Sequence, residues 1–128
     1  MFMAIYKTKW FARWSRKNGL SDSSICAAVS EMTNGLYDAN LGGGLYKKRI
    51  AKQGQGKSGG FRTLLASNFG NRWFFMYGFE KNQRSNIDKD EEDALKLLAE
   101  KFLALSNKEI EQATQSDEFI EVNCNENK

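Results

Sequence analysis

Residues 61–79, FRTLLASNFGNRWFFMYGF, hold two apolar segments on either side of a short turn. Aromatic and branched side chains in residues 61–68 and 72–79 favour β-strands, and Gly70-Asn71 between them is a hairpin signal. An RNA-recognition sheet would expose such rings for base stacking, whereas a continuous apolar strand more often lies inside a sheet. Because helices are available to cover the sheet, we expect most rings of residues 73–79 to be buried.

A third strand is predicted at residues 45–52, after the glycine run at 42–44. Side chains alternate between the two faces of a strand, so Lys47 and Arg49 share one face. The other face then carries Tyr46, Lys48 and Ile50. We therefore expect one face of the sheet to be basic.

Helical segments flank these strands. A short strand is predicted at residues 1–6, and Trp10 and Trp14 then have the i, i+4 spacing of a helix that Asn18-Gly19 ends. Residues 21–23 offer N-caps for a second helix, which stops at Asn34-Gly35. Two helices with so short a break predict an αα-hairpin.

A further helix is predicted from Asp88, because Asp88 and Glu91 have the spacing of a capping box. Weaker signals follow, for a short helix at residues 107–114 and a strand at 119–122. Strands grouped between helices predict an α+β fold with an antiparallel meander. In the helix that is predicted from Asp88, we expect the buried side to be formed by Leu95, Leu98, Phe102 and Leu105.

The chain has 128 residues, with no histidine and two cysteines. Catalytic triads with a histidine base and zinc sites with histidine ligands are therefore excluded. Cys26 and Cys124 lie far apart in the sequence and form no CxxC motif, so we expect neither a disulfide nor a metal site, as in a reduced intracellular protein. No segment approaches the ~20 apolar residues of a membrane helix, and the first residues do not fit a secretory signal, so a cytoplasmic protein is expected.

Positive charge is concentrated in the first two thirds of the chain. Residues 1–87 hold 14 Lys and Arg against four Asp and Glu, whereas residues 88–128 hold five Lys against 12 acidic residues. A basic sheet face suits a phosphate backbone, because each cation that meets a phosphate releases a counterion. The alternative is an ordinary solvated face with the acidic tail folded across it.

Residues 54–58, GQGKS, resemble the end of a Walker A motif. The full motif needs a glycine where this chain has Ala51, and it must open a helix. Residues 61–65 predict a strand instead, so ATP or GTP binding is not expected. The glycines still leave an unhindered edge for a phosphodiester, with Lys57 in the loop and Arg62 in the next strand.

The segments GLYKKRIA (44–51), GQGKSGGFR (54–62) and YGFEKN (77–82) resemble the RelE/HigB superfamily of type II toxins, most closely its HigB-type branch. The resemblance implies a RelE-like domain at residues 1–105, an αα-hairpin packed on a curved antiparallel sheet with a C-terminal helix. Residues 106–128 would form an acidic extension. The better-studied members of the superfamily enter the ribosomal A site and cleave mRNA, and a cognate antitoxin, often of the helix-turn-helix type in this branch, covers the active face.

By position, the basic site residues of the family match Lys47, Arg49, Arg62 and Lys81, and Lys57 belongs to the loop motif of this branch. We expect Arg62 to clamp the phosphate with help from Arg49, since arginine stays charged and presents two donors. Lys47 is the expected general base for attack by the ribose 2′-OH, with Lys57 or Lys81 protonating the leaving 5′-oxygen. The expected RNA-binding residues are Lys48, Lys52 and Arg84.

Three functions fit these observations. The first is an endoribonuclease that needs no metal or cofactor, with an antitoxin, mRNA and the ribosome as partners and no membrane or nucleotide cofactor. The second is a non-enzymatic toxin of the same fold that binds a protein target such as gyrase. The third is a catalytically silent RNA-binding module with a steep salt dependence.

The chain departs from the family pattern at one position of the expected site. Some family members use a tyrosine or histidine near the last helix for proton transfer, where this chain has Asn86-Ile87-Asp88.

Overall fold

The structure is a computed structural model that describes residues 4–52 and 59–124. Its described elements are four helices and one six-stranded mixed sheet with the strand order β2-β3-β4-β5-β1-β6. In chain order they are β1 (Ala4–Thr8), α1 (Lys9–Lys17), α2 (Asp22–Thr33), β2 (Ala39–Gly42), β3 (Leu45–Ile50), β4 (Phe61–Ser67), β5 (Arg72–Glu80), α3 (Lys89–Leu103), α4 (Asn107–Gln115) and β6 (Phe119–Glu121).

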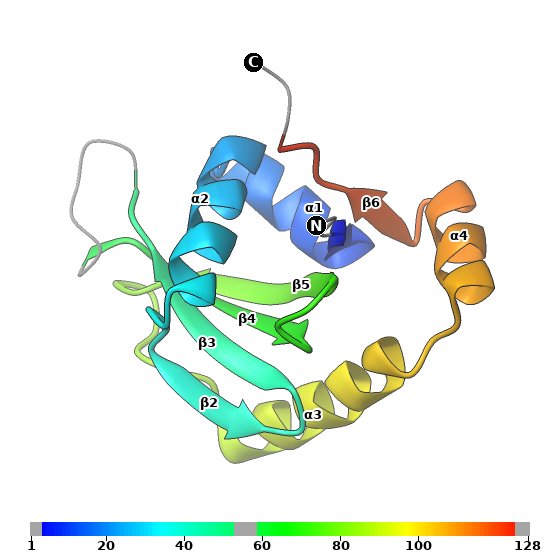
Figure 1. Ribbon diagram of the computed structural model, residues 1–128. Helices are drawn as coiled ribbons and strands as arrows, with labels where there is room; N and C mark the ends of the chain where they lie inside the picture. Colours follow the sequence, from blue (N-terminus) through cyan, green and yellow to red (C-terminus); the bar gives the residue numbers. More distant parts are fainter. Residues whose placement is uncertain (1–3, 53–58, 125–128) are drawn as a thin grey trace.

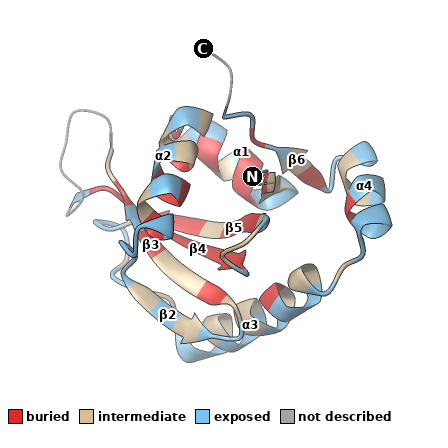
Figure 2. Ribbon diagram, in the orientation of Figure 1, coloured by how far each residue is buried: buried red, intermediate tan, exposed pale blue. Residues whose placement is uncertain are grey.

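Helices cover the sheet from both sides, with α1 and α2 over one face and α3 over the other (Figure 1). The strands supply side chains alternately to two apolar cores, so their central parts are buried on both faces (Figure 2). Trp73, Phe74 and Phe75 are fully buried, which confirms the prediction for the aromatic strand. None of the helices in the described ranges is long and apolar enough to cross a bilayer.

The sheet is mixed, which corrects the prediction of a purely antiparallel sheet. Strands β2 to β5 do form an antiparallel meander. However, β1 pairs in parallel with the free edge of β5, and β6 pairs antiparallel with β1. An open strand edge leaves backbone N–H and C=O groups without partners, and β1 satisfies them on β5. Two helices and three strands separate β1 from β5 along the chain, so no local sequence pattern reveals their pairing.

Helix boundaries follow local capping signals. Ser21 accepts a hydrogen bond from the backbone N–H of Ser24 at the start of α2, as the polar segment 21–23 predicts. Asp88 and Glu91 form the predicted capping box of α3. The weak helix and strand signals after residue 105 correspond to α4 and β6. The division of the chain into residues 1–105 and 106–128 stays a prediction.

Cys26 and Cys124 form a disulfide, so the expectation of two reduced cysteines is wrong. Cys26 lies in α2, and Cys124 follows β6, with their Cα atoms 5.7 Å apart. The backbone N–H of Val122 donates to the carbonyl of Ile5, and the buried Val122 side chain joins the same core as α2. This packing draws the chain end toward α2. The sequence separation of 98 residues hid that proximity.

Gly78 lets α1 pack closely against β5. A Cβ atom at Gly78 would lie 2.5 Å from Cζ3 and 2.6 Å from Cη2 of Trp14. The Trp14 ring already packs against Phe11 and Phe61, so it has little room to move away. Because overpacking a filled core costs roughly 1–3 kcal/mol, we expect Gly78→Ala to lower the free energy of unfolding by about 2 kcal/mol in urea denaturation.

Gly70→Ala is the matched control for this variant. The atom nearest to an added Cβ at Gly70 is Oδ1 of Asn68, at 3.4 Å, which is an ordinary van der Waals distance. Its expected effect is below ~0.5 kcal/mol. Equal losses in the two variants would show that contact with Trp14 is not the cause.

Candidate nucleic-acid interface

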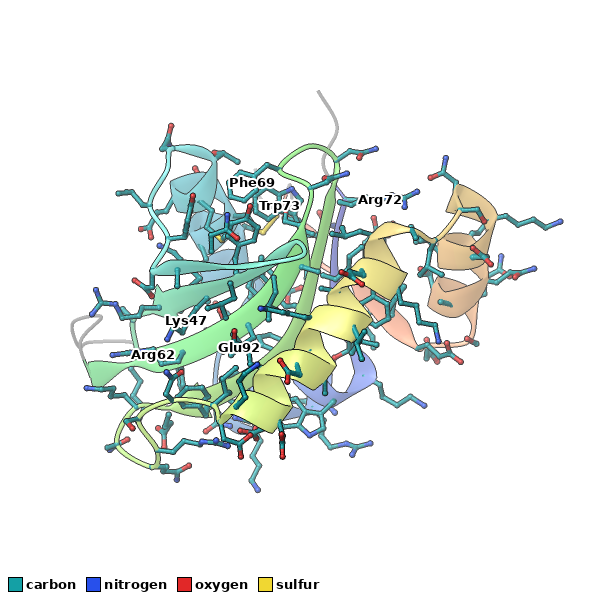
Figure 3. The ribbon with its side chains drawn as sticks, turned by 90° about the horizontal axis from the view of Figure 1, so that it is seen from below. Lys47, Arg62, Phe69, Arg72, Trp73 and Glu92 are labelled. Atoms are coloured by element: carbon teal, nitrogen blue, oxygen red, sulfur yellow. A yellow bond between two sulfur atoms is a disulfide. The ribbon has the colours of Figure 1, made fainter. Side chains whose placement is uncertain are left out.

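Three cations gather on the face of the sheet that also carries α3. Lys47 and Arg49 lie on β3, and Arg49 stands directly opposite Arg62 of β4. On the next strand, Phe79 stands opposite Arg62. Figure 3 shows Lys47 and Arg62 close together on neighbouring strands beside α3. We call Lys47, Arg49 and Arg62 the cation cluster.

Arg62 is largely buried, with 8% of its surface exposed. Burial lowers the pKa of its guanidinium, the charge of Arg49 lowers it further, and the carboxylate of Asp38 raises it. Nε of Arg49 donates to Oδ1 of Asp38 at 3.1 Å. Asp38 thus offsets the repulsion between two guanidiniums that face each other across the strands. A partly desolvated cation attracts a phosphate more strongly than one in open water.

Lys47 reaches toward the segment that precedes α3. Its Nζ donates to Oδ1 of Asn86 at 3.2 Å, and the same oxygen accepts from the backbone N–H of Ile87 at 2.9 Å. Asn86 lies in the segment where the resemblance implies a tyrosine or histidine. This amide therefore holds the Lys47 ammonium group beside the segment that precedes α3.

Arg84 holds the same segment in place. Its Nε donates to the carbonyl of Asn86 at 3.0 Å, and its other nitrogens donate to Glu91 and, at 3.3 Å, to the hydroxyl of Tyr77. The guanidinium also lies 5.5 Å from the ring centre of Phe79. Arg84 thus organises the border of the site, and direct contact with RNA stays a prediction.

Lys48 lies on the opposite face of β3, beneath α2, which corrects its expected role in RNA binding. Its side chain is 4% exposed, and Nζ donates to Oε1 of Glu31 at 2.6 Å and to the carbonyl of Leu36 at 3.0 Å. A buried ammonium that is already paired is not available to a phosphate. The strand alternation that separates Lys48 from Lys47 therefore gives it a structural role.

The other predicted cations border the cluster. Lys52 forms an ion pair with Glu80, so its charge is already balanced. Lys81 is exposed, and its backbone N–H donates to the carbonyl of Gly60 at 3.1 Å, which places it at the start of β4. Lys57 lies outside the described residues. The chain after this loop enters the strand β4 rather than a helix, as predicted.

Tyr77 is a site residue that the sequence did not reveal. Leu64 pairs with Tyr77 and Leu65 pairs with Phe75, so Met76 is an extra residue in β5. Such a bulge changes the alternation of a strand. Phe75 consequently packs beneath α1, whereas Tyr77 lies on the opposite face, that of the cation cluster. In an apolar strand, no local signal marks the bulge.

The pair of Arg84 and Glu91 makes the stability of this border depend on pH. The hydrogen bonds from Arg84, and then the one from the backbone N–H of Asp88, lower the pKa of Glu91 below its usual 4.5. The pair therefore stabilises the fold fully above the unfolded pKa, and this contribution is lost as the pH falls through the folded one. We expect the melting temperature of the native protein to fall more steeply below about pH 4.5 than that of Glu91→Gln.

Melting curves from pH 7 to about pH 3 test this expectation. Glutamine at position 91 still accepts the capping hydrogen bond, so α3 keeps its start. Asp90→Asn is the control, because it removes a charge from the same turn without touching Arg84. Parallel curves for the native protein and Glu91→Gln would contradict the assignment.

A comparison with known protein families gives one match over most of the chain. Residues 3–122 match the family described as the RelE toxin of the RelE / RelB toxin-antitoxin system. No curated protein matches the chain. Within residues 4–52 and 59–124, no three Cys, Asp or Glu side chains are grouped to hold a metal ion.

Proposed function

The chain belongs to the RelE toxin family, the toxin half of a toxin–antitoxin system, and from that premise we propose that it is a ribosome-dependent mRNA endoribonuclease of the HigB-type branch. The family implies an antitoxin partner. We further propose that this antitoxin is of the helix-turn-helix type, and that the toxin acts in the cytoplasm, where it meets mRNA on ribosomes.

The observation that carries the proposal is the pairing of Arg49 and Arg62 across β3 and β4. Two guanidiniums on adjacent strands present several N–H donors toward one phosphate group. Asp38 balances part of their charge, and the buried Arg62 is held more rigidly than a surface side chain. Such donors stabilise the negative charge that grows on the oxygens of a phosphorane transition state.

The proposed reaction breaks one phosphodiester bond. The ribose 2′-oxygen attacks the adjacent phosphorus in line, a 2′,3′-cyclic phosphate forms, and the 5′-oxygen leaves. Lys47, positioned by Asn86, takes the proton of the 2′-OH. Lys81 or Lys57 donates a proton to the leaving oxygen. Arg62 and Arg49 hold the phosphate throughout.

A translation reaction with a defined mRNA tests the proposal. Primer extension is expected to show cuts within the ribosome-bound reading frame that need both the toxin and translating ribosomes, and the downstream fragments carry a 5′-OH. Intact mRNA together with gyrase-dependent DNA breaks would support the non-enzymatic toxin instead. Salt-sensitive RNA binding without any cut would support the silent RNA-binding module.

A further inference from the structure

Trp10 is an exposed aromatic side chain at the border of the candidate site. It is 44% exposed, and its ring stacks on Tyr77 with a centroid distance of 4.7 Å and an interplanar angle of 28°. Tyr77 and Lys47 both pair with Leu64, one from each side, so they belong to one row across the sheet. Because its ring stacks on Tyr77, Trp10 extends the row that contains Lys47 beyond β5.

The stacked rings form a continuous aromatic surface. Trp10 also stacks on Trp14 in the next turn of α1, at 6.2 Å and 12°. The hydroxyl of Tyr77 accepts a hydrogen bond from Arg84, which fixes the ring on which Trp10 rests. The Trp10 side chain is already held in one orientation by its ring contacts, and much of its surface is open. Stacking on a further ring therefore costs little additional conformational entropy.

Charge on α1 points to the same kind of ligand. The sequence of α1, KWFARWSRK, contains four basic residues and no acidic one. Arg13 and Lys17 follow Trp10 by three and seven residues, so the three side chains lie along one side of the helix, and all three are exposed. Aromatic rings beside a line of cations are typical of sites for single-stranded nucleic acid, in which rings stack on bases and cations contact phosphates.

We propose that Trp10 stacks on an unpaired base of the mRNA next to the cut phosphodiester, and that Arg13 and Lys17 contact the phosphates beyond it. This inference rests on the proposed endoribonuclease function. The mRNA then runs from the cation cluster over Tyr77 and Trp10 onto α1. Because every base has a stacking face, Trp10 contributes affinity and position rather than recognition of one base.

Cleavage kinetics on ribosomes programmed with a defined mRNA test the role of Trp10. Trp10→Ala is expected to raise the half-saturating concentration about tenfold with little change in the maximal rate, since stacking on one base contributes an effect of that order. Trp10→Phe keeps a ring and is expected to remain within about threefold of the native protein. Leu97→Ala, which truncates another exposed apolar side chain, on α3, is the matched control and is expected to change neither value.

The salt dependence tests the phosphate contacts independently. Loss of two contacts to a single strand lowers the slope of log affinity against log salt by about 1.4. The double variant Arg13→Gln/Lys17→Gln is expected to show that change on the same ribosomal complexes. The control is Lys89→Gln/Lys108→Gln, which removes the same charge from exposed positions on α3 and α4, and its slope is expected to match that of the native protein.

The outcomes separate this inference from the function on which it rests. If the native protein cuts mRNA and Trp10→Ala cuts with unchanged kinetics, the stacking role is wrong while the endoribonuclease stands. A fall in maximal rate alone would mean that Trp10 only positions Tyr77, and it would also overturn the inference. If Trp10→Ala cleaves mRNA like the native protein but is no longer inhibited by the antitoxin, the surface around Trp10 binds the antitoxin. That result would overturn the inference. Absence of cutting by the native protein would overturn both proposals.

Discussion

Arg62→Ala is expected to reduce mRNA cleavage by about 100- to 1,000-fold and to remove growth inhibition, because in the proposed mechanism it deletes a preorganised donor to the phosphorane. The variant is expected to remain folded at the assay temperature, although truncation of a largely buried side chain removes packing and lowers the melting temperature somewhat. Single-turnover cleavage on ribosomes and thermal melting measure the two effects.

Two further variants sharpen this prediction. Arg62→Lys keeps the charge but loses the forked donor geometry, so we expect only a small part of the cleavage rate to remain. Lys108→Ala removes an exposed cation from α4 and is expected to cleave like the native protein. Full toxicity of a folded Arg62→Ala protein would exclude Arg62 from the mechanism and leave the cation cluster without its buried member.

Reduction of the disulfide is expected to lower the free energy of unfolding by about 3–5 kcal/mol. The bond between Cys26 and Cys124 closes a loop with a sequence separation of 98 residues, and long loops restrict the unfolded chain most. It also holds the segment after β6, including Val122, against the core below α2. Urea denaturation with and without a thiol reductant measures the difference.

Cys26→Ser provides the control for this measurement. Its unfolding midpoint is expected to coincide with that of the reduced native protein and to be insensitive to the reductant. Identical midpoints for the oxidised and reduced native protein would contradict the prediction. Since disulfides rarely persist in the cytosol, the reduced value is the relevant one at the proposed site of action.

The ion pairs of the fold change how the positive charge of the sequence is interpreted. Arg49, Lys52 and Arg84 each pair with a carboxylate, and Lys48 pairs with Glu31 beneath α2. Part of the basic excess of residues 1–87 therefore stabilises the fold and is not available to a ligand. A count of charges along the chain predicts a basic surface but does not separate the cations that meet a ligand from those that hold a loop.

The sequence alone determined the elements that depend on near neighbours. The caps at Ser21 and Asp88 specify where α2 and α3 begin, because each satisfies backbone groups within one turn. Strand alternation placed Lys47 and Arg49 on one face, because successive side chains of a strand point to opposite sides. These features need no knowledge of distant partners, so they can be predicted from short segments.

The tertiary structure decided what depends on contacts between distant segments. The parallel pairing of β1 with β5, the disulfide to Cys124 and the ion pair that buries Lys48 each join segments that the sequence does not connect. The bulge at Met76 turned Tyr77 toward the cation cluster, and its stacking on Trp10 brought α1 to the site. Strand register and long-range packing are set by the best overall burial of the chain, and local sequence patterns do not contain that information.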